Sequence, residues 1–379
     1  VIATAEIARL LSSFGIDQIA LRTLARNTSK QTEILSTAIG VKVASSIAAV
    51  GLFGLGAWYL RFTGQMWIGF GLLAADFFLA ALVQSLVTFH QASIDAGRAV
   101  PAVLAGTGMT IIAGLLAYSL WAPMPLFLAS VPAGSAAAAL ISWLITVRFV
   151  RPGISYVSLN SMKGLAARAW PIAVTGLTVI LYFRLSTVML AKMQGLAAVA
   201  SFTPAYKLSE GFLLLPVALA GTTLPMLARR FGPERHTEAW RLIALAAFGA
   251  GILSLPFGFV CSAFGGFLLV HIFGPAYASS ALALSILGWA TVAMAINQQT
   301  ANALLALNKE RLIMLVALGN LGTNFVANLV LIPRLSYNGS AIATLITEIA
   351  NVSIQTILLV RLLRMRPSFS ASKQLIEMS

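Results

Sequence analysis

The stretch LRTLAR at residues 21–26 returns at residues 224–229 as LPMLAR. Each copy ends a long apolar run, and a short polar segment follows it. A new helix is then predicted to begin at a Thr-Glu pair, at Thr32 after the first copy and at Thr237 after the second. Leu, Ala and Arg are common residues, so the shared surroundings carry more weight than the six letters. Together they indicate a duplicated unit.

The composition is that of a membrane protein. Hydrophobic residues make up 59% of the 379 residues and charged residues only 9%, whereas a soluble domain carries about 25% charged residues. Apolar runs of about twenty residues recur, each long enough to cross ~30 Å of hydrocarbon as a helix. Segments of about ten residues in which apolar and polar residues alternate are absent from the sequence, which argues against an outer-membrane barrel. The sequence therefore predicts an all-α polytopic membrane protein.

Apolar windows and their loop breaks predict eleven transmembrane helices. The run at 196–228 is too long for one perpendicular span, and we expect bends at Pro204, Pro216 and Gly221. The predicted helices cover residues 1–21, 34–60, 67–89, 99–121, 125–147, 170–190, 196–228, 240–262, 280–305, 312–333 and 338–363.

Loop charges predict the orientation. One set of loops, with the C-terminal tail, carries eighteen basic residues, and the opposite set carries three, Arg61, Lys192 and Arg334. The positive-inside rule places the richer set, and the C-terminus, in the cytoplasm and residue 1 outside. The richer set consists of Arg22, Arg26, Lys30, Arg98, Arg148, Arg151, Lys163, Arg168, Arg229, Arg230, Arg235, Arg241, Lys309, Arg311, Arg361, Arg364, Arg366 and Lys373.

The repeat and the odd helix count predict a twelve-helix, two-lobe fold that lacks its first helix. The helix that begins near Trp170 precedes the second LxxLAR helix, and it has no counterpart before the first. The expected parts are an N-terminal lobe at 1–147 with five helices, a cytoplasmic linker at 148–169, and a C-terminal lobe at 170–379 with six helices and a short tail. The residues before Glu6 do not resemble a signal peptide.

Several classes of function are disfavoured. The net charge of +14 does not indicate nucleic-acid binding, because the basic residues lie in short loops rather than in blocks with aromatic residues. The single Cys261 permits no internal disulfide, and His90, His236 and His271 lack metal-ligand spacing, so neither a metal nor a cofactor is expected. No phosphate-binding GxxxxGK[ST] loop is present.

Charged residues inside predicted spans are the candidate site. An ionised group at mid-bilayer costs at least ~2.5–3.5 kcal/mol, so such groups normally face a partner or a watery cavity. Two pairs spaced i,i+3, Glu6 with Arg9 and Lys207 with Glu210, are either structural ion pairs or cavity groups. Lys42 and Arg184 have no acid three or four residues away, and the lone acids Asp76 and Glu348 could neutralise them across the bundle. We expect a cavity that is on balance cationic and that favours anions.

Three stretches carry a family resemblance. They are FGIDQIALRTLARN from Phe14, the segment from Tyr182 to Arg229 that begins YFRLSTVML, and LGNLGTNFVANLVLIPRLSYNGSAIATLITEIA from Leu318. In these stretches the chain resembles the polysaccharide (O-antigen-type oligosaccharide) flippases of the multidrug/oligosaccharidyl-lipid/polysaccharide exporter superfamily. There are two departures: Ser186 stands where the family often has an acid, and Phe202 stands where it often has Tyr.

The resemblance implies a transporter, not an enzyme, in the bacterial cytoplasmic (inner) membrane. Its cargo would be a polyprenyl-diphosphate-linked oligosaccharide that moves from the cytoplasmic to the outer leaflet for cell-surface polysaccharide synthesis. The implied partners are this glycan, membrane lipids, and neighbouring glycosyltransferases and a polysaccharide polymerase. Lys42, Arg184 and Lys207 would bind the diphosphate in the cavity, and Asp76, Glu210 and Glu348 would be cavity acids or ion-coupling groups.

Two other functions remain open. A cation-coupled multidrug antiporter of the same superfamily needs a membrane acid that titrates, and Asp76 and Glu348 are candidates. A membrane-embedded glycan polymerase is less favoured, because such enzymes carry a large outer loop with catalytic residues. Here the longest predicted outer segment, FGGFLLVHIFGPAYASS, contains no acid or base except His271.

Overall fold

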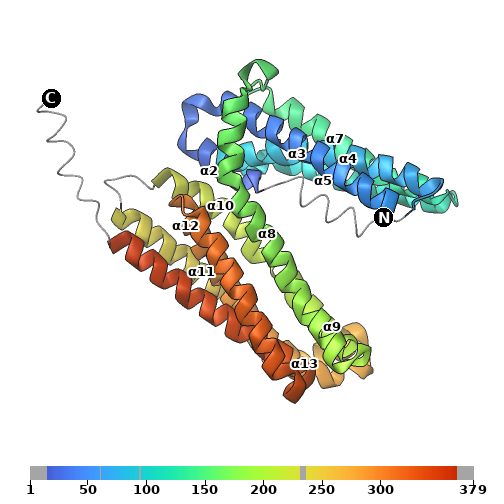
Figure 1. Ribbon diagram of the computed structural model, residues 1–379, viewed down its shortest axis with the longest axis vertical. Coiled ribbons are helices and arrows are strands. Elements are labelled where there is room, and N and C mark those ends of the chain that lie inside the picture. The colour runs from blue at the N-terminus through green and yellow to red at the C-terminus, as the bar shows by residue number, and fades with distance from the viewer. Residues whose placement is uncertain (1–14, 60, 94, 231–235, 365–379) are drawn as a thin grey trace, which may run out of the picture. The chain divides into compact units, whose positions relative to one another are not determined.

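Figure 1 shows the computed structural model, which describes residues 15–59, 61–93, 95–230 and 236–364. Throughout these ranges the regular elements are α-helices and short 3-10 helices, as the composition predicts. The chain divides into two compact units. The first comprises Val1–Arg184, Gly221–Arg229 and Leu305–Leu321, and the second comprises Leu185–Ala220, Arg230–Leu304 and Gly322–Ser379. These limits differ from the predicted lobes at 1–147 and 170–379, which stay a prediction.

The first unit is centred on α4. This helix packs against α2, α3 and α7, and α7 in turn packs against α5. Phe53 of α3 lies with its ring centroid 4.8 Å from that of Phe70 and 6.1 Å from that of Phe77, both in α4. The helices are α2 (Ile16–Arg26), α3 (Gln31–Tyr59), α4 (Gln65–Ala92), α5 (Val100–Ser119), α6 (Met124–Leu128), α7 (Ser130–Thr146) and the first part of α8 (Leu159–Gln194).

Small residues bring α5 and α7 into backbone contact. A Cβ added at Gly106 of α5 would lie 2.9 Å from the Gly134 carbonyl oxygen and 2.7 Å from the Ala138 Cβ. A Cβ added at Gly134 would lie 2.6 Å from the Gly106 carbonyl oxygen. Gly106 and Thr110 on α5, and Gly134 and Ala138 on α7, follow the small-xxx-small spacing that lets membrane helices approach closely. Neither glycine accepts a side chain without a shift of the helices.

The second unit has its own apolar core. Leu190 of α8, Phe202 of α9, Leu269 of α11, Leu287 of α12 and Ile332 of α13 are buried together in it. The helices that follow α8 are α9 (Leu196–Phe212), α10 (Leu214–Arg230), α11 (His236–Phe273), α12 (Ala281–Ala306) and α13 (Glu310–Arg364).

The 55 residues of α13 form a helical hairpin. Ser336 leaves the helical region with φ 50° and ψ −133°. A Cβ added at Gly339 would lie 2.3 Å from the Leu331 carbonyl oxygen, although residues eight apart in a straight helix are ~12 Å apart. Asn324 also donates to Thr347 across the turn. The two halves, orange and red in Figure 1, therefore run back along one another, which separates the predicted spans 312–333 and 338–363.

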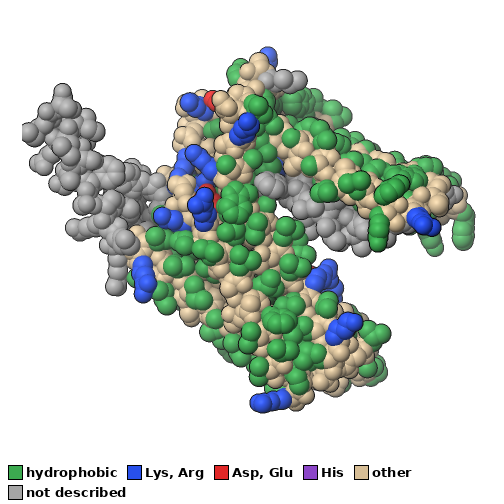
Figure 2. All heavy atoms as spheres, viewed as in Figure 1, with side chains coloured by type: hydrophobic (Ala, Val, Ile, Leu, Met, Phe, Trp, Pro, Cys, Tyr) green, Lys and Arg blue, Asp and Glu red, His purple; other side chains and the backbone are tan. Residues whose placement is uncertain are grey.

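Nine helical segments within the described ranges are long and apolar enough to cross a membrane. The predicted count of eleven helices is not confirmed, and most of the predicted span 1–21 lies outside the described residues. Large apolar side chains such as Leu104, Phe248 and Val326 are exposed on the helices, and apolar atoms cover much of the face that Figure 2 shows. A chain with such a surface requires a lipid environment.

Three boundaries differ from those predicted. The linker predicted at 148–169 becomes helical at Leu159, and α8 continues through Gly164 and Pro171. The first part of the predicted outer segment FGGFLLVHIFGPAYASS belongs to α11, which ends at Phe273. Gly274 then adopts φ 107° before Pro275. The long run at 196–228 breaks at Leu213, while Pro216 lies in the first turn of α10, where proline costs little.

Candidate functional site

The predicted cavity cation Lys42 forms a buried ion pair. This α3 side chain is 1% exposed, and its Nζ contacts Asp17 Oδ1 in the first turn of α2. The hydroxyl of Thr88 in α4 donates to the same oxygen over 3.3 Å. The sequence offered Asp76 and Glu348 as acids that could neutralise Lys42, and the structure pairs it with Asp17. Its partner is an acid 25 residues earlier in the chain, in α2.

Asp17 is positioned by a close approach of backbones. Gly15, at the start of α2, has φ 66°, and a Cβ there would lie 2.8 Å from Ile172 Cβ and from the Ala173 nitrogen of α8. Only glycine adopts this conformation readily and also fits this space. The first turn of α2 therefore lies against α8, and this fixes the depth of Asp17.

Asp76 also lies in the first unit, but in a different environment. It is 2% exposed in α4, and Ser135 Oγ of α7 donates a short hydrogen bond to its Oδ1. A hydroxyl that donates to a carboxylate makes a strong, charge-assisted bond.

Lys207 and Glu210 of α9 form the predicted i,i+3 ion pair. Their side chains are 52% and 38% exposed, so this pair is open to its surroundings. Arg184 of α8 is exposed as well, and it joins no ion pair with the described residues. The second predicted pair, Glu6 with Arg9, lies outside the described residues.

Glu348 belongs to a buried network of amide and hydroxyl side chains in the second unit. It is 4% exposed in the second half of α13, and Asn297 of α12 donates to its Oε2 over 2.6 Å. One turn further, Thr300 donates to Gln355 Oε1 over 2.8 Å. Gln355 in turn donates to Asn351 Oδ1 over 2.7 Å. These contacts tie α12 to α13.

A neighbouring set of polar groups involves Ser186, the residue that departs from the family pattern. Asn328 Nδ2 donates to Ser186 Oγ over 3.2 Å and to Asn324 Oδ1 over 2.9 Å. All three residues are buried. The position where the family often has an acid therefore contains a hydroxyl that is matched by two neutral amides on α13.

Sequence reasoning missed Asn297, Asn324 and Asn328. A signal was present, because asparagines three or four residues apart in an apolar helix are costly unless they find partners. In NLGTNFVAN, Asn324 and Asn328 lie one turn apart on the same helix face. We considered only ionisable residues as site candidates, so these asparagines were not predicted.

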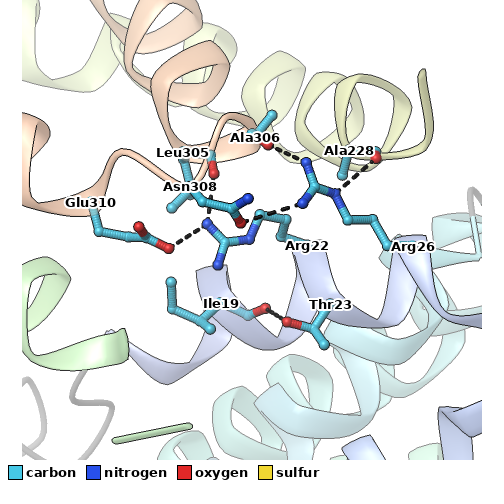
Figure 3. Close-up of polar contacts among 9 residues, drawn as sticks. All are labelled: Ile19, Arg22, Thr23, Arg26, Ala228, Leu305, Ala306, Asn308 and Glu310. Atoms are coloured by element: carbon cyan, nitrogen blue, oxygen red, sulfur yellow. Dashed lines mark hydrogen bonds and ion pairs between the residues drawn. The ribbon is translucent and has the colours of Figure 1, made fainter. Parts of the chain in front are cut away.

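Arginines gather where α2 ends (Figure 3). Arg22 is 2% exposed, donates to the Leu305 carbonyl oxygen over 2.7 Å and forms an ion pair with Glu310. We counted Arg22 among the loop charges that set topology. In the structure its side chain is buried and paired. A hydrogen bond to a charged group contributes ~1.5–3 kcal/mol.

Arg26 extends the cluster to three carbonyl and amide oxygens. Its Nε donates to Ala228 O over 3.1 Å, and its other nitrogens donate to Ala306 O and to Asn308 Oδ1 (Figure 3). Burial, and then the nearby charge of Arg22, lower the pKa of Arg26, and Glu310 raises it. A guanidinium stays protonated at neutral pH, so the cluster remains charged.

Both LxxLAR segments end helices, as the repeat predicts. The first closes α2, the second lies at the end of α10, and each precedes a long helix, α3 or α11. Arg229 of the second copy donates to the Ala92 carbonyl oxygen, at the end of α4, over 2.6 Å. The ends of four helices that are predicted to lie on the cytoplasmic side therefore meet within the first unit.

Solved transporter structures resemble this fold. A multidrug resistance MATE family transporter of the MOP superfamily, in an outward-facing conformation, superposes with a TM-score of 0.80 at 15% identity, over 96% of this chain and 86% of that one. A variant of the Vibrio cholerae MATE transporter VcmN gives a TM-score of 0.79 at 15% identity, with the same coverage. The fold is that of the MATE transporters.

The sequence comparisons agree and add a flippase. Residues 171–330 match the MatE family. The chain is 26% identical over 215 residues to the "Probable flippase AglR" of Haloferax volcanii, over 55% of this chain. The match covers 44% of the length of that relative. These similar proteins are transporters or a flippase, in agreement with the expectation of a transporter rather than an enzyme.

Proposed function

We propose that this chain flips a polyprenyl-diphosphate-linked oligosaccharide from the cytoplasmic to the outer leaflet of the cytoplasmic membrane. The similarity to a probable flippase supports a flipping activity. The resemblance of the three quoted stretches to polysaccharide flippases supports this cargo class. Outward movement of the anionic diphosphate gains ~2.3 kcal/mol per charge per 100 mV of inside-negative potential. Alternating access of two lobes to a central cavity would carry the head group, while the lipid tail stays in the bilayer.

The observation that carries the proposal is that one basic residue within the predicted spans, Arg184, has no ion-pair partner among the described residues. Lys42 is neutralised by Asp17, and Lys207 is paired with Glu210. Arg184 is exposed and forms no ion pair with the described residues. An arginine so placed offers two parallel donors to a phosphate. We therefore assign diphosphate binding to Arg184 first, with Lys207 as a second contact and Lys42 as a positioning residue.

The test uses purified protein in liposomes that contain a fluorescent short-chain polyprenyl-diphosphate disaccharide. A membrane-impermeant quencher measures how fast the head group crosses. Arg184→Ala should slow flipping by about tenfold or more, the factor that ~1.4 kcal/mol produces, and Arg184→Lys should be milder. Lys192→Ala is the matched control, because this exposed residue lies near the end of the same helix. Equal rates in the wild type and Arg184→Ala would refute the assignment, and no flipping by the wild type would refute the function.

A cation-coupled multidrug antiporter is the second candidate. The solved structures with this fold include multidrug transporters, and two buried acids, Asp76 and Glu348, accept hydrogen bonds from neutral side chains. In the same liposomes, an imposed proton or sodium gradient should then drive movement of a fluorescent organic cation, and Glu348→Gln should abolish it. No movement of the organic cation under either gradient would exclude this candidate.

A further inference from the structure

The arginines of the two LxxLAR segments make reciprocal contacts. Arg26, in the first copy, donates to Ala228 O in the second copy and to Ala306 O at the end of α12. Arg229, in the second copy, donates to Ala92 O at the end of α4. Helix α12 belongs to the predicted C-terminal lobe and α4 to the predicted N-terminal lobe. Each arginine thus reaches from its own half of the predicted duplication to the end of a helix in the other half.

Helix C-termini suit these partners chemically. The last four carbonyl groups of a helix lack intrahelical donors, and the helix dipole places partial negative charge there. A guanidinium carries five N–H donors in a fixed plane and can satisfy several such oxygens together. At α12, Asn308 adopts φ 59° beyond the last turn, and its side-chain oxygen also accepts from Arg26.

Topology alone does not require this arrangement. A loop charge that sets orientation can remain solvated, as Arg98 does with a side chain 44% exposed. Arg22 is instead 2% exposed, and it joins the same cluster through Leu305 O and Glu310. The chain has therefore buried a cation and matched its donors at the place where the two halves of the repeat meet.

We infer that Arg22, Arg26 and Arg229 form a latch that holds the predicted cytoplasmic end of the transporter closed. The inference rests on the proposed transport function, because a latch has a role only in a protein that opens and closes. Every contact described joins a residue before 93 to a residue after 227. Movement of one predicted lobe away from the other would break all of them together, so the cluster sets the fraction of molecules that are open at this end.

Cysteine labelling of the full-length protein in nanodiscs tests the latch without any substrate. Ala306→Cys and Ala92→Cys are separate reporters, because both alanines are 0% exposed and lie under the two ends of the latch. The native Cys261, 1% exposed in α11, reports general unfolding in the same sample. A maleimide reagent is added, and the adduct at each cysteine is quantified by mass spectrometry. Should A306C itself expose Cys261, Ala228→Cys at a position 1% exposed replaces it.

Arg26→Ala should raise the labelling rate at both reporters by about tenfold or more, equivalent to ~1.4 kcal/mol, while Cys261 stays protected. The rise at the A92C reporter is decisive, since the hydrogen bonds of Arg26 described above go to Ala228, Ala306 and Asn308, whereas Ala92 accepts from Arg229, so that Arg26 affects Ala92 if the latch opens as one unit. The matched control Arg98→Ala should leave both reporters protected.

Three results would overturn the latch. Unchanged labelling in the combined R26A and R229A variant would show that the end stays closed without these arginines. A rise at the A306C reporter alone would show local capping, and a parallel rise at Cys261 would show a purely structural role. The labelling needs no lipid-linked cargo, so it distinguishes failure of the latch from failure of the flippase proposal.

Discussion

The two units differ in how they stabilise buried charge. The first unit pairs two buried cations with acids, Lys42 with Asp17 and Arg22 with Glu310, although its acid Asp76 accepts a hydrogen bond from the neutral hydroxyl of Ser135. In the second unit the buried acid Glu348 accepts from the neutral amide of Asn297, and Thr300 and Gln355 add a further neutral contact between α12 and α13. Removing one partner of a buried ion pair leaves an uncompensated charge, whereas removing one amide leaves only weaker polar groups unmatched. Substitutions that break either ion pair should therefore lower the free energy of unfolding more than substitutions of the neutral groups in the second unit.

The largest effect is expected at Asp17. Asp17→Ala strands the buried Lys42 ammonium and should lower the free energy of unfolding by ~3–5 kcal/mol. Thermal unfolding in nanodiscs, followed by fluorescence or calorimetry, measures the change. The D17A and K42M double variant should recover much of the loss, because the stranded charge is gone. A double variant no more stable than D17A would show that the ion pair is not the cause.

Glu310→Gln should have the next largest effect. Arg22 loses its ionic partner but keeps the Leu305 carbonyl oxygen, and Glu310 is 12% exposed, so water can reach part of the site. We expect a loss of ~1.5–3 kcal/mol, the range for hydrogen bonds to charged groups. Chemical denaturation of matched samples tests it, with Glu33→Gln as a control in another helix N-terminal turn. Equal losses in E310Q and E33Q would contradict a specific role for the pair.

Within the second unit, Asn328→Leu should cost less. This substitution removes the donor to Ser186 and Asn324, and interhelical hydrogen bonds in membranes average ~0.6 kcal/mol with a maximum of ~1.7. A double-mutant cycle with Ser186→Ala isolates the contact from side-chain packing. A coupling energy as large as that of the Asp17–Lys42 pair would remove the contrast between the units.

The smallest effect should come from Lys207→Ala. The Lys207–Glu210 pair is largely exposed, and exposed i,i+3 or i,i+4 pairs contribute ~0.2–0.5 kcal/mol. The unfolding temperature should stay close to that of the wild type. If flipping slows in this variant while stability is unchanged, Lys207 contacts cargo. A clear loss of stability would instead place this pair with the buried charges.

Much of the fold could be predicted from the sequence, because long apolar runs identify membrane helices. The predicted helix 34–60 is α3 at Gln31–Tyr59, and the predicted helix 280–305 is α12 at Ala281–Ala306. The predicted gap between helices 312–333 and 338–363 contains Ser336, where α13 leaves the helical region. Errors arose where helices continue past the hydrocarbon thickness, as α8 and α11 do, since hydropathy reports the span but not the helix end.

The site was predicted less well, for a physical reason. Helix α3 is apolar on all sides and gives no periodic signal for the face that packs inward, so the sequence did not show that Lys42 meets Asp17. The local pair of Lys207 with Glu210 was predicted correctly because helical geometry alone sets it. The arginine cluster was not predicted, because the positive-inside rule already accounted for basic residues in these loops. The LxxLAR repeat did contain Arg26 and Arg229, the two arginines that donate to helix ends in the other predicted half.

The close crossing of α5 and α7 bears on how a lipid tail could travel. A prenyl chain that remains in the bilayer during head-group transfer needs a lateral portal, a gap between two neighbouring helices that is wide enough for hydrocarbon. At Gly106 and Gly134, the backbones lie too close even for a methyl group. Because the two glycines have no side chains, α5 and α7 pack directly together and leave no gap for hydrocarbon at this crossing. A lipid tail must therefore pass the bundle by another route.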